Sequence, residues 1–306
     1  MSIPIEWTLI NATQITSLWA SYGHILRKTY RIDKYNTITT IEKIVSPPTN
    51  NEYDESHMRR MLSYQIERYF YKNLAPLLEY TKANIAKVYQ CSLDSLEIQD
   101  LRIQYPIEYD TLGYNHTKIV LQSLAAFHAR FWYYECPLIK PPSLVEGNTD
   151  EGIWEEGCYW YLRARKVEYE KLTEPWKRIA RVVDDRIQKI PAKFKTVVHG
   201  DLKCANMVFS NDEKCAFYDF QYVGGGPGVR DLAKFMVSSV DNVEKHEEEY
   251  LAFYFGELKS LLSESGKGKD YSFEIMIEHY ELCFVDYYRF LLGGVKDCIQ
   301  SCMFDH

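Results

Sequence analysis

A dense cluster of polar residues inside an apolar stretch is the feature that most constrains this chain. The stretch VVHGDLKCANMVF, residues 197–209, carries a histidine, an aspartate, a lysine and an asparagine within eight positions. A second acidic residue, Asp219, follows the strand-like run CAFY eighteen residues after Asp201. Because burying polar groups without partners is costly, the pattern predicts side chains that converge on one charged ligand.

Phosphoryl transfer needs side chains of these types. It requires a base or orienting group for an acceptor hydroxyl, together with oxygen ligands for magnesium. Asp201 and Asn206 lie five residues apart in one loop, and a hairpin would deliver Asp219 to the same point. Lys203 would then place a positive charge where a γ-phosphate gathers negative charge. In the alternative interpretation, Asp201 and Asn206 cap a turn and Lys203 is solvated.

Length and charge exclude some classes of protein. A chain of 306 residues that is 46% hydrophobic can form one large domain or two lobes that share a cleft. Its 36 basic and 43 acidic residues give a net charge of -7 without a basic run, which argues against a nucleic-acid partner. The acceptor partner would instead be a small molecule, and the oligomeric state stays open.

The cysteines and the apolar segments indicate a compartment. The eight cysteines form no CxxC pair, so we expect reduced thiols rather than a zinc site or a redox pair. The first ten residues lack a basic segment, and polar residues interrupt the longest apolar stretch. We therefore expect a cytoplasmic protein with no membrane partner.

The order of the patterns predicts two lobes of unequal size. Residues 1–100 predict a three-strand meander in ITSLWAS, ILRKTYRID and TITTIEKIV, a long helix over residues 57–78, and a short strand in SLEIQDL. Residues 101–306 predict a mainly helical lobe with short strands between residues 196 and 221. We expect ATP to bind in the first lobe, and catalysis and acceptor binding in the second.

Several motifs resemble one superfamily. HGDLKCAN at 199–206 and DFQ at 219–221 resemble the kinase-like small-molecule phosphotransferases, which include the aminoglycoside phosphotransferases and the choline kinases. LAAFHARFW at 124–132 and VRDLAKFM at 229–236 are similar to the LAxxHAxFW and DLAxFL segments of the ecdysteroid kinase-like (CHK kinase-like) branch. The resemblance implies an α+β, two-lobed, protein-kinase-like fold with a small N-terminal antiparallel sheet and a larger helical C-terminal lobe.

The resemblance also implies roles for residues of the catalytic loop. Asp201 would be the catalytic base or the group that orients the hydroxyl, and Asn206 and Asp219 would be the magnesium ligands. His199 would support the loop, and Asp231 would brace it without reacting. Lys203 resembles the lysine of protein-kinase catalytic loops, which implies a catalytic contact with the γ-phosphate of ATP.

The first lobe should supply the remaining ATP contacts. Alternation in TITTIEKIV places Lys43 on an otherwise apolar face, where it would bind the α- and β-phosphates and need an acidic partner. Glu67 is the candidate, because no basic residue stands three or four positions after it. In the alternative, Lys43 lies on an edge strand and reaches water, and Glu67 faces solvent.

Two further positions are expected at the nucleotide. Gly23, in ASYGHILRK, marks the phosphate-covering loop, although protein kinases use several glycines there. EIQDL at 97–101 resembles the LEDL of the ecdysteroid kinase-like branch, which implies that adenine binds the connector at Asp100.

The sequence thus predicts an ATP- and Mg²⁺-dependent kinase that phosphorylates a hydroxyl group of a small molecule. A protein kinase is disfavoured because DFQ replaces DFG, no APE follows, and VGGGPGVRD leaves little room for an activation loop. A choline or ethanolamine kinase is an alternative, since aromatic residues between 154 and 161 could hold an amine by cation-π contact or else fill the core. A second alternative is a nucleotide-binding pseudokinase scaffold without turnover. We expect residues 135–195 and the C-terminal helices to form the acceptor site.

Overall fold

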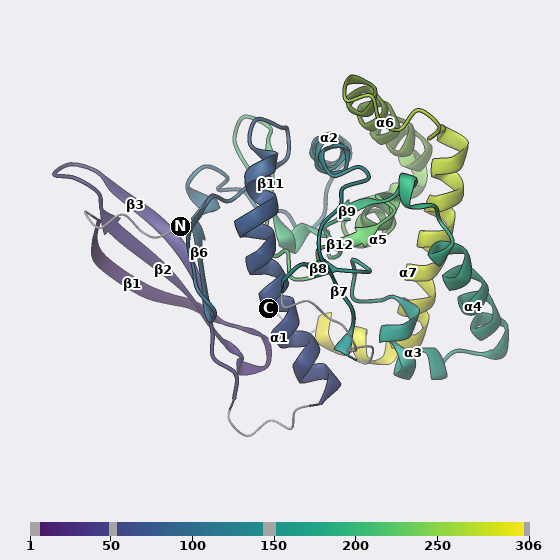
Figure 1. The fold of residues 1–306 in the computed structure, drawn as a ribbon, viewed down its shortest axis with the longest axis horizontal. Helices are drawn as coiled ribbons and strands as arrows, with labels where there is room; N and C mark the ends of the chain where they lie inside the picture. The colour runs from purple at the N-terminus through teal and green to yellow at the C-terminus, as the bar shows by residue number, and fades with distance from the viewer. Residues whose placement is uncertain (1–6, 49–53, 143–150, 303–306) are drawn as a thin grey trace.

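The structure is a computed structural model that describes residues 7–48, 54–142 and 151–302, with side chains through residue 294. An antiparallel sheet lies at one end of the molecule and a group of helices at the other, with one long helix between them (Figure 1). This arrangement confirms the predicted α+β fold with two lobes, a small N-terminal antiparallel sheet and a larger helical part. The proposed division at residue 100 stays a prediction.

The N-terminal sheet has the strand order β1-β2-β3-β6-β5. Its strands are β1 (Thr8–Ser17), β2 (Gly23–Arg31), β3 (Thr37–Val45), β5 (Val88–Cys91) and β6 (Ser95–Gln99). The predicted meander is present, because β2 pairs antiparallel with both β1 and β3. The first strand lies earlier than expected, since Trp19–Ser21 forms a 3₁₀ turn in which Ala20 and Ser21 have positive φ.

Helix α1 (Glu55–Tyr69) follows the sheet and begins at a side-chain cap. The carboxylate of Asp54 accepts a hydrogen bond of 2.7 Å from the backbone N–H of His57, which satisfies one free donor of the first turn. The chain continues through a π-helical turn at Phe70–Leu74 and a 3₁₀ turn at Ala75–Leu78. The single helix predicted over 57–78 therefore changes its winding from Phe70 onward, ahead of Pro76, which cannot donate a helical hydrogen bond.

The C-terminal lobe is mainly helical, as predicted. Its helices are α2 (Tyr114–Arg130), α3 (Lys166–Glu170), α4 (Glu174–Gln188), α5 (Val229–Ser239), α6 (Val243–Glu264) and α7 (Phe273–Cys302). Its short strands are β7 (Leu138–Ile139), β8 (Ile153–Trp154), β9 (Thr196–Val198), β10 (Met207–Phe209), β11 (Cys215–Phe217) and β12 (Gly224–Gly226). Strand β4 (Asn84–Ile85), from the segment before this lobe, pairs with them. They form two small sheets, in the orders β10-β11-β4 and β7-β8-β12-β9.

The glycine run at β12 is a strand that the sequence did not predict. β12 pairs antiparallel with β9, and its Gly224 also pairs with Trp154 of β8. A Cβ on Gly224 would lie 2.5 Å from the carbonyl oxygen of Trp154, so these chains approach too closely for a side chain. Close packing explains glycine here, although glycine disfavours strands in general.

A continuous core joins the helices of the larger lobe, with fully buried side chains such as Phe127, Phe131 and Tyr254. In the part of the chain that the structure describes, no helix is long and apolar enough to cross a membrane. Among the cysteines whose side chains are described, six are free. Cys298 and Cys302 lie outside the described side chains.

Candidate active site

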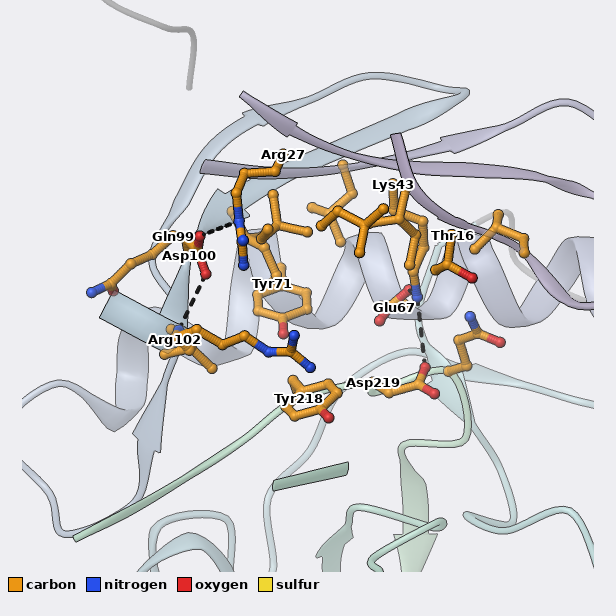
Figure 2. A pocket seen from close by; sticks show the side chains of 18 of the residues that line it. Thr16, Arg27, Lys43, Glu67, Tyr71, Gln99, Asp100, Arg102, Tyr218 and Asp219 are labelled. Atoms are coloured by element: carbon orange, nitrogen blue, oxygen red, sulfur yellow. Dashed lines mark hydrogen bonds and ion pairs between the residues drawn. The ribbon is translucent and has the colours of Figure 1, made fainter. Parts of the chain in front are cut away.

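A cavity of about 430 Å³ lies between the N-terminal sheet and the C-terminal lobe. Residues of β1, β3, β6 and the connector after β6 line one side, and Val208, Tyr218 and Asp219 line the other. Figure 2 shows Lys43, Glu67 and Asp219 gathered at one end of this cavity, with Arg27, Asp100 and Arg102 at the other. The volume lies in the range of small-molecule sites.

Lys43 is held between two carboxylates. Its Nζ lies 2.6 Å from Glu67 Oε2 and 3.6 Å from Asp219 Oδ1. Neither alternative interpretation holds, because β3 lies inside its sheet and Glu67 on α1 is only 3% exposed. Burial alone would lower the pKa of Lys43, but the charges of Glu67 and Asp219 outweigh this effect and raise it. Lys43 is therefore a fixed positive charge in the cavity.

Asp219 bridges the two lobes. It follows β11 with a positive φ of 64°, a conformation unusual for a residue other than glycine and often found at functional sites. The next residue, Phe220, is fully buried and stacks on Phe70 after α1, with ring centroids 3.8 Å apart. This stacking anchors the turn that points the Asp219 carboxylate toward Lys43.

The residues of the loop after β9 that the sequence singled out do lie together. Asn206 Nδ2 donates to the backbone oxygen of Asp201 at 2.8 Å and to its Oδ2 at 3.1 Å. Lys203 Nζ lies 3.4 Å from the same Oδ2, and Lys234 Nζ lies 2.5 Å from Oδ1. Burial alone would raise the pKa of Asp201, but Lys234 and Lys203 hold it below its ordinary value. The carboxylate is thus ionised and fixed in direction.

Asp231, at the start of α5, braces this loop as expected. Its Oδ2 accepts from the backbone N–H of His199 at 2.7 Å, and its Oδ1 accepts from that of Gly200 at 2.9 Å. His128 of α2 reaches the same carboxylate with Nε2 at 3.1 Å and Tyr254 with Nδ1 at 2.7 Å. The histidine of LAAFHARFW therefore ties α2, α5 and α6 to the catalytic loop.

His199 supports the loop without facing the cavity. Its Nε2 lies 3.0 Å from the backbone oxygen of Tyr218, and its Nδ1 accepts from the backbone N–H of Asp201 at 3.3 Å. Complete burial lowers the pKa of His199, so the ring is neutral and one nitrogen donates while the other accepts. This position joins the loop to the segment that carries Asp219.

Gly23 and Asp100 have structural contacts that account for their residue types. A Cβ on Gly23 would lie 1.9 Å from the carbonyl oxygen of Ile44, so close strand approach alone requires glycine there. The Asp100 carboxylate pairs with Arg27 Nε at 2.8 Å and accepts from the Arg102 backbone at 3.2 Å. Asp100 lines the cavity and Gly23 is not among its lining residues; their nucleotide contacts stay predictions.

Sequence reasoning missed Lys234, although it stands inside the quoted motif VRDLAKFM. The side chain is 2% exposed and forms the shortest of the ion pairs described here for Asp201. The available signal was the spacing of Lys234 from Asp231. Residues three positions apart in a helix project from the same face, and Lys234 is three residues after Asp231. A lysine in a helix is ordinarily solvated, so the sequence alone gave it no role.

Asp219 at the cavity and Asn206 of the loop carry oxygen atoms of the kind that a hard divalent cation prefers. Asp219 Oδ1 is buried and accepts no hydrogen bond from the described residues. The Asn206 amide nitrogen is occupied by Asp201, which leaves its oxygen as the remaining acceptor. No cluster of three or more His, Cys, Asp and Glu side chains within the described residues could hold a metal alone. Waters or the oxygen atoms of a bound ligand would have to complete the coordination.

Comparisons with known proteins agree with this geometry. The model of the ecdysteroid kinase-like family matches residues 157–266, which include the catalytic loop, Asp219 and Asp231. No curated protein matches.

Solved structures share the fold at low sequence identity. A choline kinase from Cryptosporidium parvum Iowa II has a TM-score of 0.54 at 12% identity, covering 96% of this chain and 91% of that one. Macrolide 2'-phosphotransferase from Brachybacterium faecium has a TM-score of 0.52 at 11% identity, covering 95% and 90%. An amicoumacin kinase in complex with AMP-PNP and Ca²⁺ has a TM-score of 0.51 at 12% identity, covering 99% and 86%. The predicted resemblance is therefore confirmed: residues 157–266 match the ecdysteroid kinase-like family, and the chain has the two-lobed fold of kinase-like small-molecule phosphotransferases.

Proposed function

We propose that this chain is an ATP- and Mg²⁺-dependent kinase that phosphorylates a hydroxyl group of a small molecule. The observation that carries the proposal is the position of Lys43 between Glu67 and Asp219 in the cavity between the lobes. A lysine fixed by a helix glutamate and lying beside a second carboxylate is suited to a nucleotide phosphate and its metal. The amicoumacin kinase of similar fold, solved with AMP-PNP, supports a nucleotide in this cavity.

In the proposed reaction, the acceptor oxygen forms a bond to the γ-phosphorus of ATP as the bond to the β–γ bridging oxygen breaks. ADP leaves, and the hydroxyl proton passes to Asp201 or to water. Lys43 would hold the α- and β-phosphates, and Lys203 would offset the charge that develops on the transferred group. Gly23 and Asp100 are proposed at the phosphate and adenine ends respectively.

Asn206 and Asp219 would hold the magnesium ion, which when bound supplies charge neutralisation between the β- and γ-phosphates. Asp201 would act mainly by orienting the acceptor hydroxyl. Its lowered pKa makes it a weak base, and a loose phosphoryl-transfer transition state asks for little proton abstraction. The residues of this chain therefore position the reactants and fix the charges around them.

The acceptor is proposed to bind beside Asp201, next to the half-buried ring of Tyr159, which packs on the buried Trp160 and, through it, on Tyr287. These rings belong to the segment 135–195 and to the C-terminal helix α7, where the acceptor site was expected. A cytoplasmic location, the absence of nucleic-acid and membrane partners, and the lobe boundary at residue 100 remain parts of this proposal. A pseudokinase scaffold is disfavoured, because it needs neither an oriented Asp201 nor two metal-binding oxygens.

Thermal unfolding with nucleotide tests the proposal before an acceptor is known. We expect saturating ATP with Mg²⁺ to raise the melting temperature by about 5 °C, since only the folded chain binds. Asp219→Asn should remove most of the magnesium-dependent part of this rise in melting temperature, whereas Asp201→Ala should retain the rise. Asp212→Asn, at an exposed turn, is the matched control and should behave as wild type. A wild-type protein that shows no shift with ATP would overturn the proposal.

A further inference from the structure

Lys234 fills a site that is built for a cation. We propose that its ammonium occupies the cation position beside Asp201. The acceptor is then a neutral or anionic alcohol that carries no ammonium group near its reacting hydroxyl. The inference rests on the proposed function, because it takes Asp201 as the residue that meets the acceptor. It narrows the substrate class and disfavours the choline or ethanolamine kinase alternative.

The contacts of Lys234 Nζ are those expected of a bound ammonium ion. The atom lies 2.5 Å from Asp201 Oδ1 and donates to the hydroxyl of Tyr159 at 2.7 Å. It lies 5.4 Å from the ring centroid of Trp160 and 5.7 Å from that of Tyr287, both within cation-π range. The ring of Tyr159 is nearer still, at 4.5 Å, so a carboxylate, a hydroxyl and three aromatic rings surround one buried positive charge.

The rings around Lys234 are rigid. Trp160 is fully buried and packs on Tyr287, with ring centroids 5.0 Å apart. The carbonyl oxygen of Trp160 accepts a hydrogen bond of 2.6 Å from Arg289, which is itself buried and paired with Asp286. Because the surrounding residues are fixed in this way, an acceptor ammonium could enter only by displacing Lys234.

Other positive charges lie close to Asp201 and Tyr159. Lys203 Nζ is 3.4 Å from the second oxygen of Asp201. The Arg165 guanidinium lies 5.3 Å from the ring centroids of both Tyr159 and Phe290. Glu168 pairs with Arg165 at 3.4 Å and offsets part of this charge. An acceptor that brings a further cation would meet repulsion here, whereas a neutral or anionic alcohol would not.

Removing the lysine should expose the cation site. We expect the full-length Lys234→Ala variant to bind tetramethylammonium at least tenfold more tightly than wild type, measured by calorimetry and by the change in total tryptophan fluorescence. Lys234→Arg keeps the charge and should stay as weak as wild type. Lys118→Ala is the matched control, since Lys118 also lies over rings, 5.1 Å from Tyr114 and 4.6 Å from Phe253, away from Asp201. Equal binding by the Lys234→Ala and Lys118→Ala variants would overturn the proposal.

A second arm uses the unmodified protein and does not depend on how any variant folds. Wild type should neither bind choline nor phosphorylate choline or ethanolamine, and measurable transfer to either would overturn the inference. The ATP-dependent thermal shift, recorded in the same samples, reports separately on the proposed function. A protein that shifts with ATP but phosphorylates choline would refute only the inference, and a protein without an ATP shift would refute the kinase assignment itself.

Discussion

Lys43, Asp201 and Lys234 illustrate how buried charges are arranged in this cleft. Each has an oppositely charged partner within 2.6 Å, and each partner lies on a different segment of the chain. A buried ion pair adds little net stability, because desolvation offsets most of the attraction. Removing one member is costly, since the other is left buried and unpaired. The pairs therefore fix side-chain positions at the site. Their contribution to stability can be measured by substituting one or both members of a pair.

The Lys43–Glu67 pair gives the first prediction. Lys43→Met leaves the Glu67 carboxylate buried and unpaired, so we expect the free energy of unfolding to fall by about 3 kcal/mol. The double variant Lys43→Met/Glu67→Gln should regain much of this stability, yet neither variant should show a thermal shift with ATP. Urea unfolding measures the stability of both variants.

The matched control for this prediction is an exposed ion pair at the end of α4. Lys189 Nζ, just after the helix, lies 2.7 Å from Asp185 Oδ2 in its last turn. Lys189→Met should cost about 0.5 kcal/mol or less. If the double variant at Lys43 and Glu67 were as unstable as the single one, the loss would come from packing and not from an unpaired charge.

The sequence predicted the positions of Lys43 and Glu67 for a physical reason. Strand alternation identified a charge on an apolar face, and the lack of a local partner identified Glu67. Lys234 carried no comparable signal, because its partners at Tyr159, Trp160 and Tyr287 come from distant parts of the chain. Gly23 illustrates the opposite situation, a predicted site residue with a structural explanation. The nearby carbonyl oxygen of Ile44 requires glycine at this position whether or not phosphate binds there.

The loop after β9 shows how elements far apart in sequence hold one active segment. Helix α5 braces the loop through Asp231, and α2 reaches the same carboxylate through His128. Gly200 completes the turn with a φ of +81°, where a Cβ would lie 2.1 Å from the carbonyl oxygen of Tyr222. The backbone of the loop thus admits no side chain at this position without moving its neighbours.

Gly200→Ala gives the second prediction. The substitution adds strain at a left-handed φ and a clash with backbone, so we expect a loss of about 3 kcal/mol in unfolding free energy. Gly256→Ala is the control, because Gly256 lies in α6 with open space around its Cβ position. That change should stabilise the protein by about 0.5 to 1 kcal/mol. Chemical denaturation of the two variants checks both signs, and a neutral Gly200→Ala would contradict the described turn.

The elements themselves were predictable to different degrees. Strands β2 and β3 carry residue alternation over many positions, and they appear where the sequence placed them. The strands β4, β7 and β8 span two residues each, too short for a repeating pattern. Strand β12 consists of glycines, so its pairing depends on neighbours that only the folded chain brings together.

The whole molecule depends on contacts that join the two lobes at the cleft. Phe220 stacks on Phe70 from the segment after α1, and Lys43 of the sheet reaches Asp219 from the larger lobe. The two-lobed fold was predictable because several motifs with known spacing fell in order along the chain. The acceptor was not predictable, because the aromatic residues of the proposed acceptor site could either pack or bind a ligand, and these two roles look alike in sequence.

The most direct test of the central claim is ATP consumption with Mg²⁺ across a panel of hydroxylated acceptors, including amino alcohols, sugars, aminoglycosides and sterols. We predict that sugars or sterols, and neither the amino alcohols nor the cationic aminoglycosides, yield ADP and a phosphate ester in equal amounts. Asp201→Asn should lower this rate at least about 100-fold, and Asp212→Asn should leave it unchanged. Phosphorylation of an acceptor at an undiminished rate by Asp201→Asn would contradict the account.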